Sequence, residues 1–302
     1  MEEAISINFD ENSRMLLNFL LAFIMFGVAL DLSFTDIVRA FKKPKPTFFG
    51  LLSQFILLPI LTFLLISVWQ PLPGLALGLF LVAACPGGNI SNFMSSLAKA
   101  DVGLSVSLTA ISTLLCLFFT PFNFEFWSGL YPGTQNLLKS VQLDAVQLLK
   151  MVFMLLFLPV LAGMALQGWK TELTQRIKKP IRWLSMLVFI GFVIGAFLKN
   201  QDNFMKYAHL VALLVLVHNM LALTLGYSIG RAANLGEPAS RSLSIETGIQ
   251  NSGLGLVISF NFFPEIGEMA LVCAWWGIWH IISGLVLSSV WSKVSVNSFS
   301  SR

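Results

Sequence analysis

Two stretches of the 302-residue chain combine residues that break helices with side chains that carry oxygen. The first is Ala84-Cys-Pro-Gly-Gly-Asn-Ile-Ser-Asn92, and the second is Ser244-Ile-Glu-Thr-Gly-Ile-Gln-Asn-Ser-Gly253. Each lies inside an otherwise apolar run, where an unpaired backbone amide is costly unless protein or water satisfies it. We therefore expect two discontinuous helices whose breaks line a protein-buried or wet cavity.

The side chains around these breaks offer the oxygen ligands that a hard monovalent cation such as Na⁺ requires. Hard cations bind several carboxylate, amide, hydroxyl and carbonyl oxygens, and a single carboxylate balances one positive charge. On insertion scales, an ionised carboxylate at the bilayer centre costs about 2.5–3.5 kcal/mol unless a cation or another function compensates it. The candidate ligands near the breaks are Ser91, Asn92, Ser105, Thr109, Glu246 and Gln250. Gln54, in an earlier apolar run, is a further candidate, although a hydrogen bond between helices explains it equally well.

The same breaks also favour an anionic ligand. The N-terminus of each second half-helix points backbone N–H groups toward the middle of the membrane, where they suit a carboxylate. Asn89 and Asn251 lie beside the glycines of the breaks, and each either hydrogen-bonds such a ligand or caps the local backbone. Of the histidines, His280 is expected to border the cavity, with a buried hydrogen bond to a break as the alternative. Since no Ser/His pair or paired carboxylates of catalytic type are evident, an enzyme is not predicted.

The composition shows that membrane-spanning helices must position these residues. Hydrophobic residues make up 56% of the chain and charged residues 11%, whereas an ordinary soluble domain has about 25% charged residues. One bilayer crossing uses about 20 apolar residues, so the length leaves no room for a sizeable soluble domain. The formal net charge of +4 comes from short basic clusters between apolar runs, which indicate topology rather than nucleic-acid binding. The chain begins with an acidic, polar stretch, and no signal peptide is expected.

The apolar runs predict an all-α multi-pass membrane protein with nine transmembrane helices. These cover residues 15–32, 47–69, 74–97, 102–122, 146–167, 181–198, 207–229, 242–264 and 269–291. With this count, 14 of the 19 Lys and Arg residues fall on one side of the membrane. The positive-inside rule makes that side cytoplasmic, so the N-terminus is expected outside and the C-terminus inside.

A cytoplasmic loop over residues 244–253 is the alternative for the second break. It would leave residues 254–263 as the apolar part of that span, about 15 Å of helix. Since this is half of the ~30 Å hydrocarbon core, the loop is disfavoured.

Two connections between the spans carry predictions of their own. Ser33 to Asp36 resembles a helix-capping signature, and the basic segment that follows it predicts a short interfacial helix. The longest external connection, residues 121–145, is expected to contain a helix lying on the membrane surface.

The broken spans occupy corresponding places in the two halves of the chain. If the first four spans match the last four, the third span starts outside and the eighth starts inside, so the two units have opposite orientations. The fifth span is then the unpaired element. Discontinuous helices in an inverted repeat are typical of secondary transporters.

Four segments together resemble the bile acid:sodium symporter family: CPGGNISN, ADVGLSVSLTAISTL, ETGIQNSGL and WHIISG. The segments IMFGVALDL, VLVHNMLAL and LGYSIGR extend the resemblance to nearly the whole chain. It implies one transmembrane domain over residues 1–302, in which the broken helices cross and ions bind behind the crossing. The implied panel domain holds spans 15–32, 146–167 and 181–198. The implied core domain holds spans 47–69, 74–97, 102–122, 207–229, 242–264 and 269–291.

Carried over residue by residue, the resemblance implies two Na⁺ sites and a substrate cavity. The first Na⁺ site corresponds to Ser91, Asn92, Ser105, Thr109 and Glu246. The second corresponds to Gln54, Glu246 and Gln250 with the backbone carbonyls of Thr247 and Ile249. The substrate cavity lies between the domains and includes Asn89, Asn251 and His280. Asn89 stands where the family has a hydroxyl residue, a departure that bears on the substrate.

The expected function is sodium-coupled symport of an organic anion by alternating access in the plasma membrane, the inner membrane of a bacterium. The resemblance implies a bile-acid-like anion or a small monocarboxylate such as pantoate or a keto acid. A proton-coupled or uncoupled organic anion carrier is the alternative, with Glu246 as the proton carrier. Since bacterial members commonly have ten spans, this chain is expected to lack the first. The expected partners are sodium ions, the anion and the lipid bilayer, without nucleic acid or an obligate protein partner.

Overall fold

The computed structural model describes residues 11–141, 145–199 and 201–294, and over these ranges the chain is helical without a β-strand. The elements are α1 (Glu11–Ala29), α2 (Phe34–Lys42), α3 (Pro44–Leu52), η1 (Ser53–Leu57), α4 (Leu58–Trp69), α5 (Pro73–Ala84), α6 (Ile90–Leu97), α7 (Val102–Leu130), η2 (Pro132–Thr134), α8 (Gln135–Val141), α9 (Ala145–Val152), η3 (Phe153–Phe157), α10 (Leu158–Trp169), α11 (Thr171–Lys199), α12 (Gln201–Ala232), α13 (Glu237–Gly248), α14 (Ser252–Phe262) and α15 (Gly267–Lys293). The turns η1 and η3 are π-helical, and η2 is a 3₁₀-helix. The predicted all-α fold is confirmed. The N-terminal residues 1–10 lie outside the described ranges.

Among the described residues, five helical segments are long and apolar enough to cross a membrane by length and composition. They are Pro44–Trp69, Val102–Leu130, Leu149–Trp169, Val211–Ala232 and Gly267–Lys293. Three shorter apolar helices in the described ranges, Met15–Gly27, Pro73–Ala84 and Ser252–Phe262, overlap the predicted spans 15–32, 74–97 and 242–264. These helices are those of a membrane protein, and the count of nine spans stays a prediction.

The helices break at both predicted positions. In the first break, α5 ends at Ala84 and α6 begins at Ile90. Pro86 between them lacks an N–H and cannot continue a helix. In the second break α13 ends at Gly248, and α14 begins after Asn251, whose Oδ1 accepts the N–H of Leu254 at 3.1 Å. The second break therefore uses a glycine and a side-chain cap in place of a proline.

The helix predicted over residues 102–122 extends further than expected. α7 runs from Val102 to Leu130 with Pro121 inside it. A proline inside a helix removes a backbone donor, but membrane helices tolerate it where neighbouring groups satisfy the freed backbone. The connection over 121–145 thus begins as part of α7. It continues through η2 and the short helix α8, and residues 142–144 lie outside the described part of the chain.

Another proline shapes the helix that carries Gln54. The π-helical turn η1 directly precedes Leu58 and Pro59 of α4. In an α-helix the carbonyl of Phe55 would accept the N–H of residue 59, which proline lacks. The buried Asn123 of α7 replaces this donor, because its Nδ2 lies 3.0 Å from the Phe55 carbonyl oxygen. The side chain thereby joins α7 to the irregular turn.

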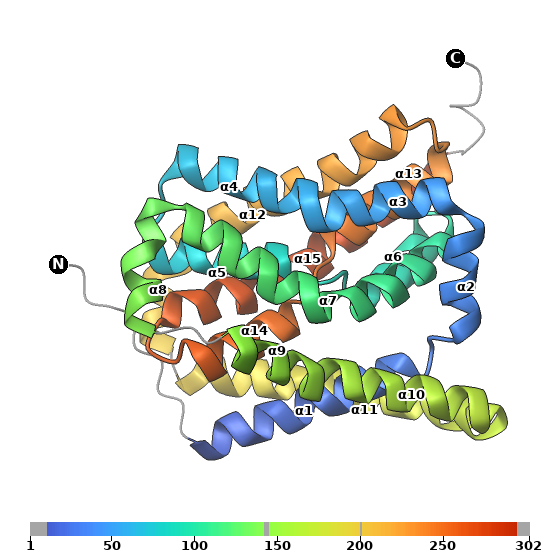
Figure 1. Cartoon of the computed structure of the whole chain (residues 1–302), viewed down its shortest axis with the longest axis horizontal. Helices are drawn as coiled ribbons and strands as arrows, with labels where there is room; N and C mark the ends of the chain where they lie inside the picture. Colours follow the sequence, from blue (N-terminus) through green and yellow to red (C-terminus); the bar gives the residue numbers. More distant parts are fainter. Residues whose placement is uncertain (1–10, 142–144, 200, 295–302) are drawn as a thin grey trace.

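Figure 1 shows the described helices in two groups, one above the other. α1, α10 and α11 pack on one another at the lower edge, while α12 packs on α13 and α5 packs on α15 and α7 above them. α14 of the upper group contacts α1 of the lower group. Between these two helices the amides of Asn18 and Asn261 donate to each other at 3.1 and 2.7 Å. The two groups are therefore joined by a reciprocal hydrogen-bonded pair.

The short helix expected after the first span is α2. The backbone N–H of Ser33 donates to Oδ2 of Asp36 at 3.0 Å, as in a capping box. Phe34 and Phe41 are exposed, and Arg39 lies in the last turn. An exposed apolar face accompanied by basic residues is typical of a helix at the membrane surface.

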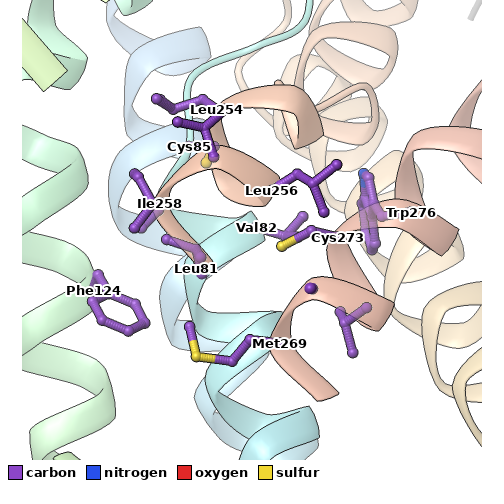
Figure 2. Close-up of a cluster of buried hydrophobic side chains, with 14 of the residues drawn as sticks. Leu81, Val82, Cys85, Phe124, Leu254, Leu256, Ile258, Met269, Cys273 and Trp276 are labelled. Carbon is purple, nitrogen blue, oxygen red and sulfur yellow. The ribbon is translucent and has the colours of Figure 1, made fainter. Parts of the chain in front are cut away.

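The main hydrophobic core lies where α5, α7, α14 and α15 meet, as Figure 2 shows. Trp276 of α15 is fully buried there. A Cβ at Gly255 would lie 3.1 Å from the Cys273 sulfur and 3.6 Å from the Cys85 sulfur, so the cysteines pack closely around this glycine. This packing fixes α5 and α14, one half of each broken helix pair, against α15.

Candidate functional site

The two helix breaks pair with each other through their backbones. The N–H of Gly88 donates to the carbonyl of Ile249 at 2.7 Å, and the N–H of Asn251 donates to the carbonyl of Pro86 at 2.8 Å. Backbone groups freed by a break inside a membrane need such partners, because no water is available in hydrocarbon. Each break therefore satisfies part of the other.

Glycines in the first break permit this close approach. Gly87 forms an antiparallel bridge with Gln250. A Cβ on Gly87 would overlap Oε1 of Glu246, and one on Gly88 would lie 2.9 Å from the Gln250 carbonyl oxygen. The glycines therefore let the Glu246 side chain lie directly against the backbone of the first break.

Hydroxyl groups from α6 and α7 surround the carboxylate of Glu246. Oε2 accepts from Oγ of Ser91 at 2.7 Å and from Oγ of Ser105 at 3.2 Å, while Oε1 accepts from Oγ1 of Thr109 at 2.8 Å. Oδ1 of Asn92 lies 3.0 Å from the Ser105 hydroxyl and 3.3 Å from the Thr109 hydroxyl. The structure thus brings together the five residues that the family resemblance implies for the first Na⁺ site.

The cluster is rich in acceptor oxygens and has no basic partner among the residues that the structure describes. Glu246 is 4% exposed, and none of the ion pairs among the described residues includes it. Each hydroxyl carries one proton, and those of Ser105 and Thr109 each lie near both Glu246 and Asn92. A carboxylate, an amide oxygen and hydroxyls within mutual reach match the ligand preferences of a hard cation. A bound cation would also compensate the buried charge.

The residues expected at a second cation site lie nearby but are bonded among themselves. Nε2 of Gln54 donates to Oε1 of Gln250 at 2.8 Å, and Nε2 of Gln250 donates back at 3.2 Å. Gln250 also donates to the carbonyl of Thr247 at 2.6 Å. The carbonyl of Ile249 accepts the N–H of Gly88 in the first break. The hydrogen bond between helices that was the alternative for Gln54 is therefore present. No hydrogen bond among the described residues joins this group to Glu246.

The residues expected to contact a substrate differ in their surroundings. Oδ1 of Asn251 caps α14, which is the capping alternative stated for this residue. Asn89 makes no cap, and its Oδ1 is buried without a hydrogen-bond partner among the described residues. His280 is 7% exposed, and its Nδ1 likewise lacks a partner there. No hydrogen bond in the described ranges joins these three side chains to one another.

Residues 18–207 match the model of the Sodium Bile acid symporter family, a range that includes the first break and α7 but ends before Glu246. The chain belongs to this family. It is 30% identical over 277 residues to an uncharacterized sodium-dependent transporter of Bacillus subtilis, with 90% of this chain and 82% of the relative covered. It is 31% identical over 273 residues to a probable chloroplastic sodium/metabolite cotransporter of Arabidopsis thaliana, with 89% of this chain and 65% of the relative covered. A probable chloroplastic sodium/metabolite cotransporter of Oryza sativa is 28% identical over 277 residues, with 92% of this chain and 66% of the relative covered.

These relatives are named transporters or cotransporters and not enzymes, and sodium stands in each name. The chain spans about two thirds of the length of the two plant relatives, at 65% and 66%. The predicted membership of the sodium-bile-acid symporter family and the sodium-dependent class of transport are therefore confirmed.

In this member of the symporter family, close packing of α13 on α12 positions Glu246. A Cβ on Gly226 of α12 would overlap the carbonyl oxygen of Leu243, and one on Gly230 would lie 2.6 Å from Cα of Ser240. Glycines four residues apart let two membrane helices approach to backbone contact. α13 is thereby fixed along α12 while Glu246 faces α6 and α7.

Two buried polar residues that the sequence analysis did not single out also support the site. Oγ of Ser95, one turn after Ser91 in α6, donates to Oγ of Ser105 at 3.1 Å. Nδ2 of Asn219 in α12 donates to the carbonyl of Gly248, the last residue of α13, at 2.7 Å. An asparagine in an apolar run is a visible signal for a hydrogen bond between helices, but the sequence does not identify its partner.

Proposed function

We propose that the chain is a sodium-coupled symporter of an organic anion. The observation that carries this proposal is the buried Glu246 carboxylate, held by the hydroxyls of Ser91, Ser105 and Thr109 without a basic partner in the described ion pairs. The family and the names of the relatives support sodium as the coupling ion.

In this proposal Na⁺ links the consecutive helices α6 and α7 to α13, which lies far from them in the sequence. The first ion binds to oxygens of Ser91, Asn92, Ser105, Thr109 and Glu246. A second ion binds to Gln54, Glu246, Gln250 and the carbonyls of Thr247 and Ile249, after the two glutamine side chains release each other. Neutralising Glu246 stabilises the contact of α13 with α6 and α7, and this holds the facing breaks in one arrangement.

The anion binds next to these breaks in the same proposal. The N-termini of α6 and α14 present N–H groups that favour a carboxylate. Asn89, Asn251 and His280 supply further polar contacts, and Asn89 has an unused buried oxygen that a donor group of the ligand satisfies. The proposed substrates are a bile-acid-like anion or a small monocarboxylate such as pantoate or a keto acid.

Alternating access requires two bodies that move against each other. We assign the panel to α1, α9 to α11 with η3, and the core to the remaining spans, within nine spans that start outside and end in the cytoplasm. The mutual packing of α1, α10 and α11 supports this division. An inverted repeat is supported by the facing breaks of α5/α6 and α13/α14. The proposed location is the plasma membrane, the inner membrane of a bacterium.

Thermal unfolding of the detergent-purified protein in NaCl, KCl and choline chloride tests the proposal. A ligand that binds only the folded state stabilises it by RT ln(1 + [L]/Kd), so the unfolding temperature rises with the logarithm of the free ligand concentration above Kd. We expect stabilisation in NaCl alone, and we expect Glu246→Gln to abolish it. Ser107→Ala is the matched control, because the Ser107 hydroxyl bonds to the Gly103 carbonyl of its own helix.

Equal unfolding temperatures in the three salts would contradict sodium coupling. A proton-coupled carrier predicts instead that stability depends on pH in KCl and that Glu246→Gln removes this dependence. An uncoupled carrier predicts neither effect.

A further inference from the structure

We propose that Asn219 of α12 is a positioning residue for Na⁺, because it sets the direction of the peptide carbonyl at Gly248 in the second break. This inference rests on the proposed sodium-coupled function. Asn219 is fully buried and lies 29 residues before its backbone partner, in a different helix.

The Gly248 carbonyl needs a partner because α13 ends there. In a continuous helix it would accept the N–H of residue 252. The N–H of Ser252 donates to the carbonyl of Gln250 at 2.9 Å instead. Nδ2 of Asn219 lies 2.7 Å from the Gly248 oxygen and supplies the missing donor. An unsatisfied carbonyl at this depth would be costly, so the interaction constrains the break strongly.

A second hydrogen bond fixes the orientation of the Asn219 amide. Oγ of Ser283 in α15 donates to Oδ1 of Asn219 at 2.6 Å. The oxygen therefore faces a hydroxyl donor, and the nitrogen faces the carbonyl of Gly248. Both ends of the amide are occupied, so Asn219 acts through the backbone and not as a ligand of the ion.

Gly248 lies between the two residues whose carbonyls we assign to the second Na⁺ site. The Thr247 carbonyl points to the side chain of Gln250, and the Ile249 carbonyl points to the N–H of Gly88. The carbonyl between them points to α12, where Asn219 holds it. Loss of this hydrogen bond would let the Gly248 peptide rotate, and rotation of one peptide displaces the carbonyls on both sides of it.

The test measures the half-saturating NaCl concentration for Na⁺ binding, obtained by fitting the logarithmic rise of the unfolding temperature with NaCl, with KCl keeping the ionic strength constant. The variants are Asn219→Ala and Ser283→Ala. Asn261→Ala is the matched control, because Asn261 also donates to a backbone carbonyl, that of Val257, and is hydrogen-bonded to a side chain of another helix, that of Asn18. The unfolding temperature in KCl alone reports the purely structural cost of each change.

We expect Asn219→Ala to raise the half-saturating NaCl concentration about tenfold and Ser283→Ala about threefold, the range of one lost hydrogen bond. We expect Asn261→Ala to leave this concentration unchanged, even where it lowers the unfolding temperature in KCl. Sodium dependence in the wild type with unchanged half-saturation in Asn219→Ala and Ser283→Ala would overturn this inference alone. If Asn219→Ala does not fold, an unchanged half-saturating NaCl concentration in Ser283→Ala overturns the inference. A wild type without Na⁺ stabilisation would overturn the proposed function together with it.

Discussion

Oγ of Ser91 in α6 lies 2.7 Å from Oε2 of Glu246 in α13, although the two residues are 155 positions apart. The contact joins α6 and α13, one half of each broken helix pair, beside the facing breaks. Since the carboxylate accepts three hydroxyl donors and no cationic side chain among the described ion pairs, its charge is balanced in the proposed function by Na⁺.

Ser91→Ala is expected to weaken Na⁺ binding without preventing folding. The change removes one oxygen from the proposed first site and one hydrogen bond to the carboxylate, and we expect about a tenfold higher half-saturating NaCl concentration in thermal unfolding. Ser107→Ala, which removes a hydroxyl of α7 that bonds within its own helix, should leave that concentration unchanged. Equal Na⁺ affinity in Ser91→Ala and the wild type would argue against a cation at this cluster.

Gly226→Val is expected to destabilise the protein by separating α12 from α13. A Cβ at this position overlaps the backbone of Leu243, which cannot move as a flexible side chain can. Overpacking of this kind costs about 1–3 kcal/mol, measured as a lower unfolding temperature in detergent. Gly168→Ala in α10 is the control, because a Cβ there meets no atom within 4 Å. The close-packing argument fails if both variants unfold at the wild-type temperature.

Asn123→Ala is expected to leave the Phe55 carbonyl without a donor, at a cost of about 1–3 kcal/mol. The reason is specific to Pro59, which cannot supply the N–H of an α-helix. In a Pro59→Ala background a backbone N–H is available, so the same asparagine substitution should cost less. A double-mutant cycle of unfolding free energies measures this coupling. Additive effects would show that Asn123 does not replace the proline's missing donor.

Arg241→Met is expected to be among the most destabilising single changes in α13. Nε of this fully buried arginine donates to Glu237 at 2.8 Å, and Nη1 donates to the Ala98 carbonyl at 2.9 Å. Removing one partner of a buried ion pair costs about 3–5 kcal/mol. The Arg231 side chain, 41% exposed and 3.2 Å from the same glutamate, should contribute less than about 1 kcal/mol. If Arg231→Met lowers the unfolding temperature more than Arg241→Met does, the assignment of Arg241 as the buried partner is wrong.

The sequence by itself determined the features that depend on neighbouring residues. Long apolar runs predicted the helices, because helix formation in a bilayer follows from local hydrophobicity and internal hydrogen bonding. Pro86 with its two glycines predicted the first break, and Ser33 with Asp36 predicted the start of α2. The apolar run predicted a fourth span over residues 102–122, whereas α7 continues to Leu130 with Pro121 inside it, since a proline weakens a helix locally while its neighbours decide whether the helix continues.

Only the tertiary structure decided which buried polar groups meet. The sequence indicated that Glu246 needs oxygen-bearing neighbours, but the approach of Ser91 and Thr109 depends on the pairing of two breaks from opposite halves of the chain. The roles of Asn123 and Asn219 were not predictable, because each satisfies a backbone carbonyl that becomes free only where another helix is irregular. Burial makes an unpaired polar group costly wherever it lies, whereas the partner that removes this cost is set by helix packing across long sequence separations.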